Sequence, residues 1–149
     1  MMVPGDKTLA DLVLFARLFH KKQMREVILI ILLEIGITPK GKGLDYLTTA
    51  IQLYVEQPSQ MITKGLYPRI CDNMEIWCTP IQVERAIRFA IRGAWKDRQN
   101  NGWRAYFFGN TEDKCPTNAD FIAYIARVMS IWMGIAEQEA EIAHEEETV

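Results

Sequence analysis

Apolar residues recur at helical spacing in one segment after another, and no stretch alternates apolar and polar residues for long enough to predict a strand. Gly36, the loop at residues 39–43 and Pro58 interrupt this spacing, because glycine and proline do not propagate a helix. We therefore expect an all-α fold, a compact domain of six to seven helices, with helices over about residues 8–22, 23–34, 43–56, 61–71, 79–96 and 119–138.

The predicted helix at residues 79–96 has two faces of opposite character. Thr79 is suited to cap a helix and Pro80 to occupy its first turn. At about 100° per residue, the apolar face carries Val83, Ala86, Ile87, Ala90, Ile91 and Ala94, and the opposite face carries Gln82, Arg85, Arg88, Arg92 and Lys96. Clustered cations repel one another and do not stabilise an isolated domain, so this face suits a polyanionic partner.

The segment before this helix completes a helix-turn-helix unit. A predicted helix at residues 61–71 is joined to the basic helix by a connector at residues 72–78. In such units the first helix braces the second across the DNA backbone, so we expect Lys64 and Arg69 to lie near phosphates.

The basic helix carries the side chains that a duplex can accept. Arg85 can donate two parallel hydrogen bonds to guanine, and Glu84 can accept one from a cytosine amino group. The longer cations suit phosphates, namely Arg88, Arg92 and Lys96. A basic helical face is also common on a solvated surface, and the pattern alone leaves that interpretation open.

Charge is distributed unevenly along the 149 residues, whose net charge is −2. Between residues 60 and 104 eight Lys and Arg face four Asp and Glu, whereas six Glu follow Gly134. We interpret residues 1–26 as an extra N-terminal helix, 27–134 as the helix-turn-helix domain, and 135–149 as an acidic tail, either a solvated helix end or disordered. Opposite charge also raises the hypothesis that this tail competes with DNA for the basic face.

The residue pattern does not support enzymatic or metal chemistry. Cys71, Cys78 and Cys115 occur without CxxC or HxxxH spacing, and the loop at residues 39–43 lacks a phosphate-loop pattern, so it is interpreted as a turn. No nucleophile stands beside a base in a recognisable arrangement. We expect no catalytic residues, metal, cofactor or small-molecule substrate.

The apolar run at residues 27–33 is too short to cross a bilayer, and the first residues lack the order of a secretory signal. We therefore expect a cytoplasmic protein without a membrane partner. Phe89 lies in the basic sector and suits equally a contact to a thymine methyl group and a protein interface. Four tryptophans are interpreted as core or covering residues rather than base-stacking platforms: Trp77, Trp95, Trp103 and Trp132.

Four blocks of the sequence resemble, in order and approximate spacing, the C-terminal DNA-binding domain of the stage zero sporulation protein A family. The blocks are LEIGI at 33–37, ITKGLYP at 62–68, VERAIRFAI at 83–91 followed by AW at 94–95, and PTN at 116–118 followed by FIA at 121–123. The resemblance covers about residues 27–132. It implies a compact six-helix fold with an internal helix-turn-helix that binds a short asymmetric promoter box, often as tandem copies.

The resemblance also implies roles for individual positions. Glu84 and Arg85 match the pair that contacts bases, and Arg88 matches a further arginine that faces DNA. Thr63 and Lys64 match positions near the phosphate backbone. On this basis Glu84 and Arg85 are the expected base contacts.

This chain departs from the family pattern in several places. The connector is about two residues longer, and Asp72 and Asn73 replace lysines that are common in the family. Gln82 stands where arginine is usual, and Phe89 stands where histidine is usual. We therefore expect weaker phosphate binding and an altered box preference. No receiver domain precedes the match in this sequence, so we expect no control by phosphorylation of a receiver aspartate.

These patterns predict a sequence-specific transcriptional regulator that binds double-stranded DNA, as a homodimer or as tandem protomers. The alternative is a protein-interaction module that does not bind DNA and modulates a related regulator. Phe89, the extra N-terminal helix and the acidic tail favour that alternative.

Overall fold

The computed structural model describes residues 24–58, 62–107 and 114–148, and all regular structure within these residues is helical. The elements are α2 (Met24–Ile35), α3 (Gly43–Glu56), η1 (Ile62–Leu66), α4 (Tyr67–Asp72), α5 (Pro80–Lys96), α6 (Trp103–Tyr106) and α7 (Asn118–Thr148). The prediction of an all-α fold is therefore confirmed. The helix predicted at residues 8–22 lies outside the described residues.

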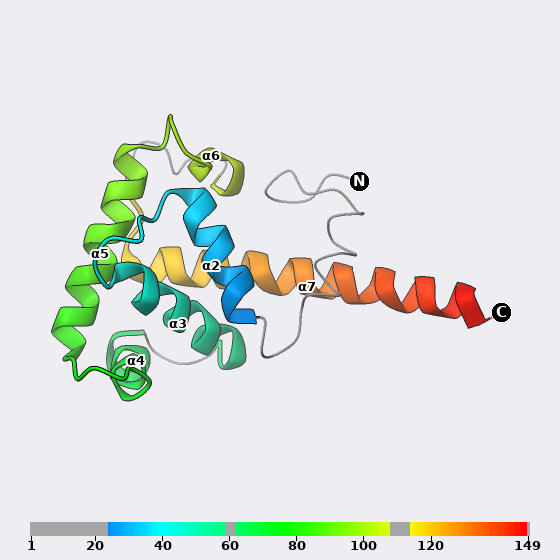
Figure 1. Cartoon of the computed structure of the whole chain (residues 1–149), viewed down its shortest axis with the longest axis horizontal. Helices are drawn as coiled ribbons and strands as arrows, with labels where there is room; N and C mark the ends of the chain where they lie inside the picture. The colour runs from blue at the N-terminus through cyan, green and yellow to red at the C-terminus, as the bar shows by residue number, and fades with distance from the viewer. Residues whose placement is uncertain (1–23, 59–61, 108–113, 149) are drawn as a thin grey trace.

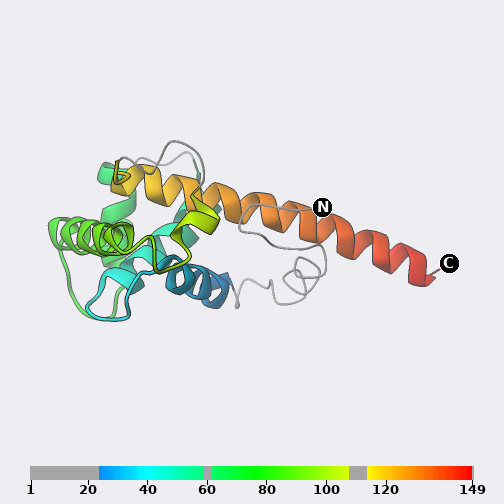
Figure 2. The same cartoon turned by 90° about the horizontal axis from the view of Figure 1, so that it is seen from above.

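Helix α3 lies at the centre of the fold and contacts α2, α5 and α7 (Figures 1 and 2). Its residues are buried on most sides, and the hydroxyl of Thr48, itself buried, donates to the carbonyl of Leu44 at 2.7 Å. This internal hydrogen bond satisfies a polar group that has no access to water. Helix α3 thus provides the surface against which the flanking helices pack.

The segment after α5 is held by aromatic packing. Trp103, Tyr106 and Phe107 are buried, and the rings of Trp103 and Phe107 stack with centroids 4.4 Å apart. Phe107 also stacks on Tyr124 of α7 at 4.7 Å. Ring contacts of this kind add to the free energy of area burial, so they fix the short helix α6 against α7.

A close approach at Gly36 joins the end of α2 to this aromatic segment. Gly36 has φ of +111°, and a Cβ atom there would lie 2.1 Å from Nδ2 of Asn101. The amide of Gly102 donates to the carbonyl of Glu34 at 2.8 Å. Only glycine meets both the backbone and the space requirement at residue 36, which accounts for the break after α2.

Two predicted helices differ from those observed. The helix expected at residues 61–71 is instead a π-helical turn, η1, that leads directly into α4. The last helix does not end near residue 138 but continues to Thr148, so no break marks the start of the acidic tail at residue 135. Alanine, glutamate and glutamine favour helix, and no proline follows Gly134 to end it.

Helix α7 extends well beyond the other helices, and its C-terminal end and α5 lie at opposite ends of the molecule in both views (Figures 1 and 2). Among the side chains of α7 that the structure describes, Trp132 is the last large one that is completely buried. None of the described helices combines the length and the apolar character needed to span a bilayer.

Candidate nucleic-acid interface

Helix α5 has a well-defined start. Oγ1 of Thr79 accepts from the amide of Gln82 at 3.2 Å, and Oε1 of Gln82 accepts from the amide of Thr79 at 3.0 Å, with Pro80 at the first helical position. This reciprocal pair satisfies two amides that a helix start leaves without intrahelical partners. It also means that the side chain of Gln82, predicted to face DNA, already has a structural role.

The two predicted faces of α5 are present in the structure. Its buried residues are Val83, Ile87, Ile91 and Ala94, with Ala86 and Ala90 half-buried against the same core. The predicted DNA-facing residues other than Glu84 are all exposed, namely Gln82, Arg85, Arg88, Phe89, Arg92 and Lys96. The period of 3.6 residues per turn therefore assigned these positions to the correct side of the helix.

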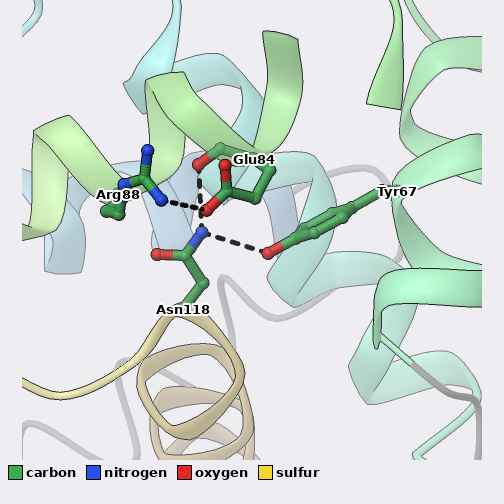
Figure 3. Close-up of polar contacts among 4 residues, drawn as sticks. All are labelled: Tyr67, Glu84, Arg88 and Asn118. Carbon is green, nitrogen blue, oxygen red and sulfur yellow. Dashed lines mark hydrogen bonds and ion pairs between the residues drawn. The ribbon is translucent and has the colours of Figure 1, made fainter. Parts of the chain in front are cut away.

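Glu84 and Arg88 form an ion pair on the edge of the basic face. Nη1 of Arg88 lies 2.9 Å from Oε1 of Glu84, one helical turn away (Figure 3). Both side chains are partly exposed, so water and salt weaken the pair and a phosphate can compete for the arginine. Arg85, Arg92 and Lys96, in contrast, form no ion pair with another residue that the structure describes.

A buried asparagine ties α5 to two other helices. Nδ2 of Asn118 donates to the hydroxyl of Tyr67 at 3.1 Å and to the backbone carbonyl of Glu84 at 3.0 Å (Figure 3). Burial raises the pKa of Tyr67, which keeps its hydroxyl neutral. Because Tyr67 belongs to α4 and Asn118 to α7, these bonds set the position of α5 relative to both.

This role of Asn118 was not evident from the sequence, where Thr117 and Asn118 stand just before the last predicted helix and either residue type could cap it. The cap itself is formed by Thr117, whose Oγ1 accepts from the amide of Asp120 at 3.1 Å. Asn118 is the first residue of α7 and turns inward instead. From the sequence alone, the residue that caps the helix could not be distinguished from the one whose side chain points inward, because threonine and asparagine are both good helix caps.

The connector between α4 and α5 is anchored at both ends. Cys71 near the end of α4 is in hydrogen-bonding contact with Cys78, which is buried immediately before the cap of α5. Burial, followed by this contact, raises the pKa of Cys71 to about 11, so Cys71 packs as a neutral thiol. The longer connector is thereby closed into a loop between two fixed points.

Some residues were predicted to contact phosphates from the helix that precedes α5, and the structure describes only part of their side chains. Lys64 is exposed in η1, whereas of Thr63 only the backbone, which lies in the same turn, is described. Nη1 of Arg69 donates to Oε1 of Gln57 at 2.7 Å, which ties α4 to the end of α3. Lys64 is therefore available at the surface for a phosphate contact, whereas Arg69 is already hydrogen-bonded to another residue of the protein.

The start of α3, directly after the loop that the sequence indicated only as a turn, lies against α5. A Cβ atom at Gly43 would lie 2.7 Å from Cβ of Ala90 and 2.9 Å from the carbonyl oxygen of Ala86. Lys42, exposed in the same loop, lines a hollow of about 330 Å³ together with Trp77 and Gln82. In the sequence, the two glycines that flank Lys42 could have indicated this contact, because glycine permits the backbone to approach another helix closely.

Several large apolar side chains are exposed around the start of α5. Trp77 is 81% exposed, so its interpretation as a core or covering residue is wrong, whereas Trp103 and Trp132 are buried and Trp95 is half-buried. Ile76 in the connector and Ile81 in the first turn of α5 are 66% and 63% exposed, and Phe89 is 83% exposed. The sequence pattern had drawn attention only to Phe89.

The structure also bears on metal and ligand chemistry. In the parts of the chain that the structure describes, no three His, Cys, Asp or Glu side chains converge as metal ligands would. The larger hollow, of about 560 Å³, lies between α3 and the connector and has mixed charges on its walls, from Arg25, Asp45, Glu56 and Glu75. Neither hollow presents a set of side chains specific for one cofactor.

A family model matches most of this architecture. The model of the sporulation initiation factor Spo0A C-terminal family matches residues 28–129. The match begins in α2, includes the whole of α5 and ends within α7, and so it contains the ion pair, the asparagine contact and the exposed basic face described above.

Proposed function

The chain belongs to the family of the sporulation initiation factor Spo0A C-terminal domain, a family of helical DNA-binding domains, and we propose that it is a sequence-specific transcriptional regulator. The observation that carries this proposal is the exposed face of α5. Arg85, Arg92 and Lys96 project from that face without an ionic partner among the described residues. A duplex supplies both the charge and the groove that such a helix fits.

In this proposal Arg85 donates to a guanine, and Glu84 accepts from a neighbouring cytosine once Arg88 has exchanged its carboxylate partner for a phosphate. Asn118 supports this exchange because it holds the backbone of Glu84 and not its side chain. The ion pair would keep Glu84 and Arg88 ordered before DNA arrives, which lowers the entropic cost of binding.

Phosphate contacts come from elements on both sides of α5. Arg92 and Lys96 extend along the helix, and Thr63 and Lys64 belong to η1 on the bracing side. We add Lys42, because it directly precedes the start of α3, which packs against α5, and lines a hollow beside that helix. Gln82 contributes to DNA binding chiefly because it caps α5. The nitrogen of its side-chain amide is directed to the backbone of DNA.

The proposed activity is binding alone, without a catalytic step or cofactor. A promoter-binding protein acts in the compartment that holds the DNA, so we propose a cytoplasmic location. Two copies, as a homodimer or as tandem protomers, would bind adjacent boxes and gain affinity from the second contact.

The direct test is fluorescence anisotropy with the full chain, a duplex that carries the family's box, a duplex selected from a random pool, and scrambled duplexes, across a salt series. We expect tighter binding to the box or the selected duplex and a steep loss of affinity with salt, because phosphate contacts release counterions. Equal, weak binding to every duplex would rule out a sequence-specific regulator.

A second function is favoured by the exposed Trp77 and Ile76 beside the start of α5. Apolar groups of this size at one place are common at protein interfaces. If no duplex binds specifically, a protein-interaction module that modulates a related regulator becomes the better proposal.

A further inference from the structure

The exposed face of α5 is not purely basic, because two large apolar residues lie within it. Ile81, Arg85 and Phe89 follow one another at intervals of four residues and so form one row along the helix surface. Ile81 also projects in nearly the same direction as Arg88 and Arg92, which are seven and eleven residues further on. The proposed guanine contact is therefore flanked by an apolar side chain on each side.

Both apolar residues are highly exposed, at 63% for Ile81 and 83% for Phe89. Neither has a role in the fold that would account for its size, since the helix buries its opposite face. Trp77 does not belong to this row, because it lies in the connector before α5, where it borders a hollow with Gln82 and Ala86. The row is thus a distinct feature of the surface.

An apolar protein partner fits this row poorly. Covering Ile81 and Phe89 would also remove water from Arg85 and its neighbouring arginines, and a buried charge without a partner is costly. The major groove of DNA supplies partners for both kinds of side chain. Guanine and phosphate oxygens accept from arginine, and thymine presents a C5-methyl group to an apolar residue.

We propose that α5 recognises a duplex in which thymines flank the guanine bound by Arg85, with Ile81 and Phe89 each in contact with a thymine methyl group. Ile81 and Phe89 are separated by about 12 Å along the helix axis, which spans roughly three to four base pairs. This inference rests on the proposed function and specifies which duplexes that function selects.

The start of α5 is sufficiently ordered for such contacts. The cap at Thr79 fixes the turn that carries Ile81, and Asn118 holds the backbone at Glu84, one residue before Arg85. A methyl contact adds specificity only when the side chain is positioned before binding, because otherwise its ordering offsets the gain.

The test uses deoxyuridine, which lacks only the C5-methyl group and keeps the hydrogen-bonding edge of thymine. A duplex is selected with the full chain from a random pool, and each thymine in it is then replaced singly by deoxyuridine. We expect about a fourfold loss of affinity at each of two thymines that flank the guanine, the value for one buried methyl group. Replacement outside the selected box should have no effect.

Two variants assign the thymines to their side chains. Ile81→Ala should lose sensitivity to deoxyuridine at one thymine and Phe89→Ala at the other, while each keeps sensitivity at the remaining position. Ile30→Ala, an exposed isoleucine on α2, is the matched control and should respond as the unmodified chain does. Thermal unfolding establishes that each variant is folded.

Three results would overturn the inference. If the chain prefers its selected duplex over a scrambled one but is indifferent to every deoxyuridine replacement, the thymine contacts are wrong and the proposed function stands. If Phe89→Ala and Ile81→Ala retain full sensitivity at both thymines, other residues make those contacts. If no duplex is preferred, the proposed function fails, and this inference fails with it.

Discussion

Helices α5 and α7 carry opposite charge and are anchored in different ways. Helix α5 is fixed at its start by a capping pair and along its length by four buried residues, and it leaves its cations at the surface. The described side chains of α7 that pack against the core belong to its first half, and its acidic second half extends beyond the other helices (Figure 1). The small net charge of the chain therefore conceals two separated surfaces of opposite sign.

The largest effect is expected from removing the anchor of α7. Trp132→Ala would leave a cavity where the indole is now completely buried, and we expect a loss of about 3–5 kcal/mol in the free energy of unfolding. Chemical denaturation monitored by circular dichroism measures it. Ile131→Ala, at the adjacent but exposed position, should cost about 1 kcal/mol or less. Similar losses for both variants would show that α7 is not held through Trp132.

The contact between the two helices should be the next most sensitive site. Asn118→Ala removes two hydrogen bonds and leaves the buried hydroxyl of Tyr67 without this partner, so we expect a loss of about 1–3 kcal/mol in stability. Asn73→Ala removes an exposed side-chain bond to Arg69 and serves as the control, with a much smaller loss. A stability of Asn118→Ala equal to that of the control would exclude the proposed link between α4, α5 and α7.

On the basic face, Arg85→Ala should weaken binding to the preferred duplex by about 1–3 kcal/mol and relax selectivity at one base pair. Arg127→Ala, which removes an exposed arginine from α7, should leave both unchanged. Anisotropy titrations against the preferred and scrambled duplexes separate these effects. Equal losses of affinity for both duplexes would mean that Arg85 contacts a phosphate and not a base.

The cap of α5 should have a smaller effect. Thr79→Ala removes the acceptor for the amide of Gln82 and should cost about 1 kcal/mol in stability. Thr79→Ser keeps the hydroxyl and should restore most of that stability. A loss in Thr79→Ser as large as in Thr79→Ala would mean that the methyl group, and not the hydroxyl, is responsible.

The smallest effect is expected from removing the acidic end of α7. A chain that stops at Gly134 should bind its duplex with an affinity within about twofold of the full chain at physiological salt, where charges act over only about 8 Å. The helical tail lies far from α5 in the same molecule (Figures 1 and 2). A marked gain in affinity on truncation would support the hypothesis that the tail competes with DNA.

Local features of the chain were enough to predict most of the helices that the structure describes and the two faces of α5, but not the π-helical turn η1, the short helix α6 or the end of α7. Thr79 and Pro80 specify a helix start through their own backbone and side-chain preferences, and the spacing of Val83, Ile87 and Ile91 selects the buried face. Such features depend on residues within one or two turns, so they can be recognised without knowing what packs nearby.

Features that depend on contacts between distant segments became visible only in the folded chain. Three such features each depend on where another helix lies: the inward turn of Asn118, the packing of α3 on α5 at Gly43, and the exposure of Trp77. The extent of α7 was underestimated because its glutamate-rich end shows no clear apolar periodicity in the sequence to mark it. Periodicity identifies the side of a helix that is buried, but the partners of that side are set by tertiary packing, because they come from residues remote in the sequence.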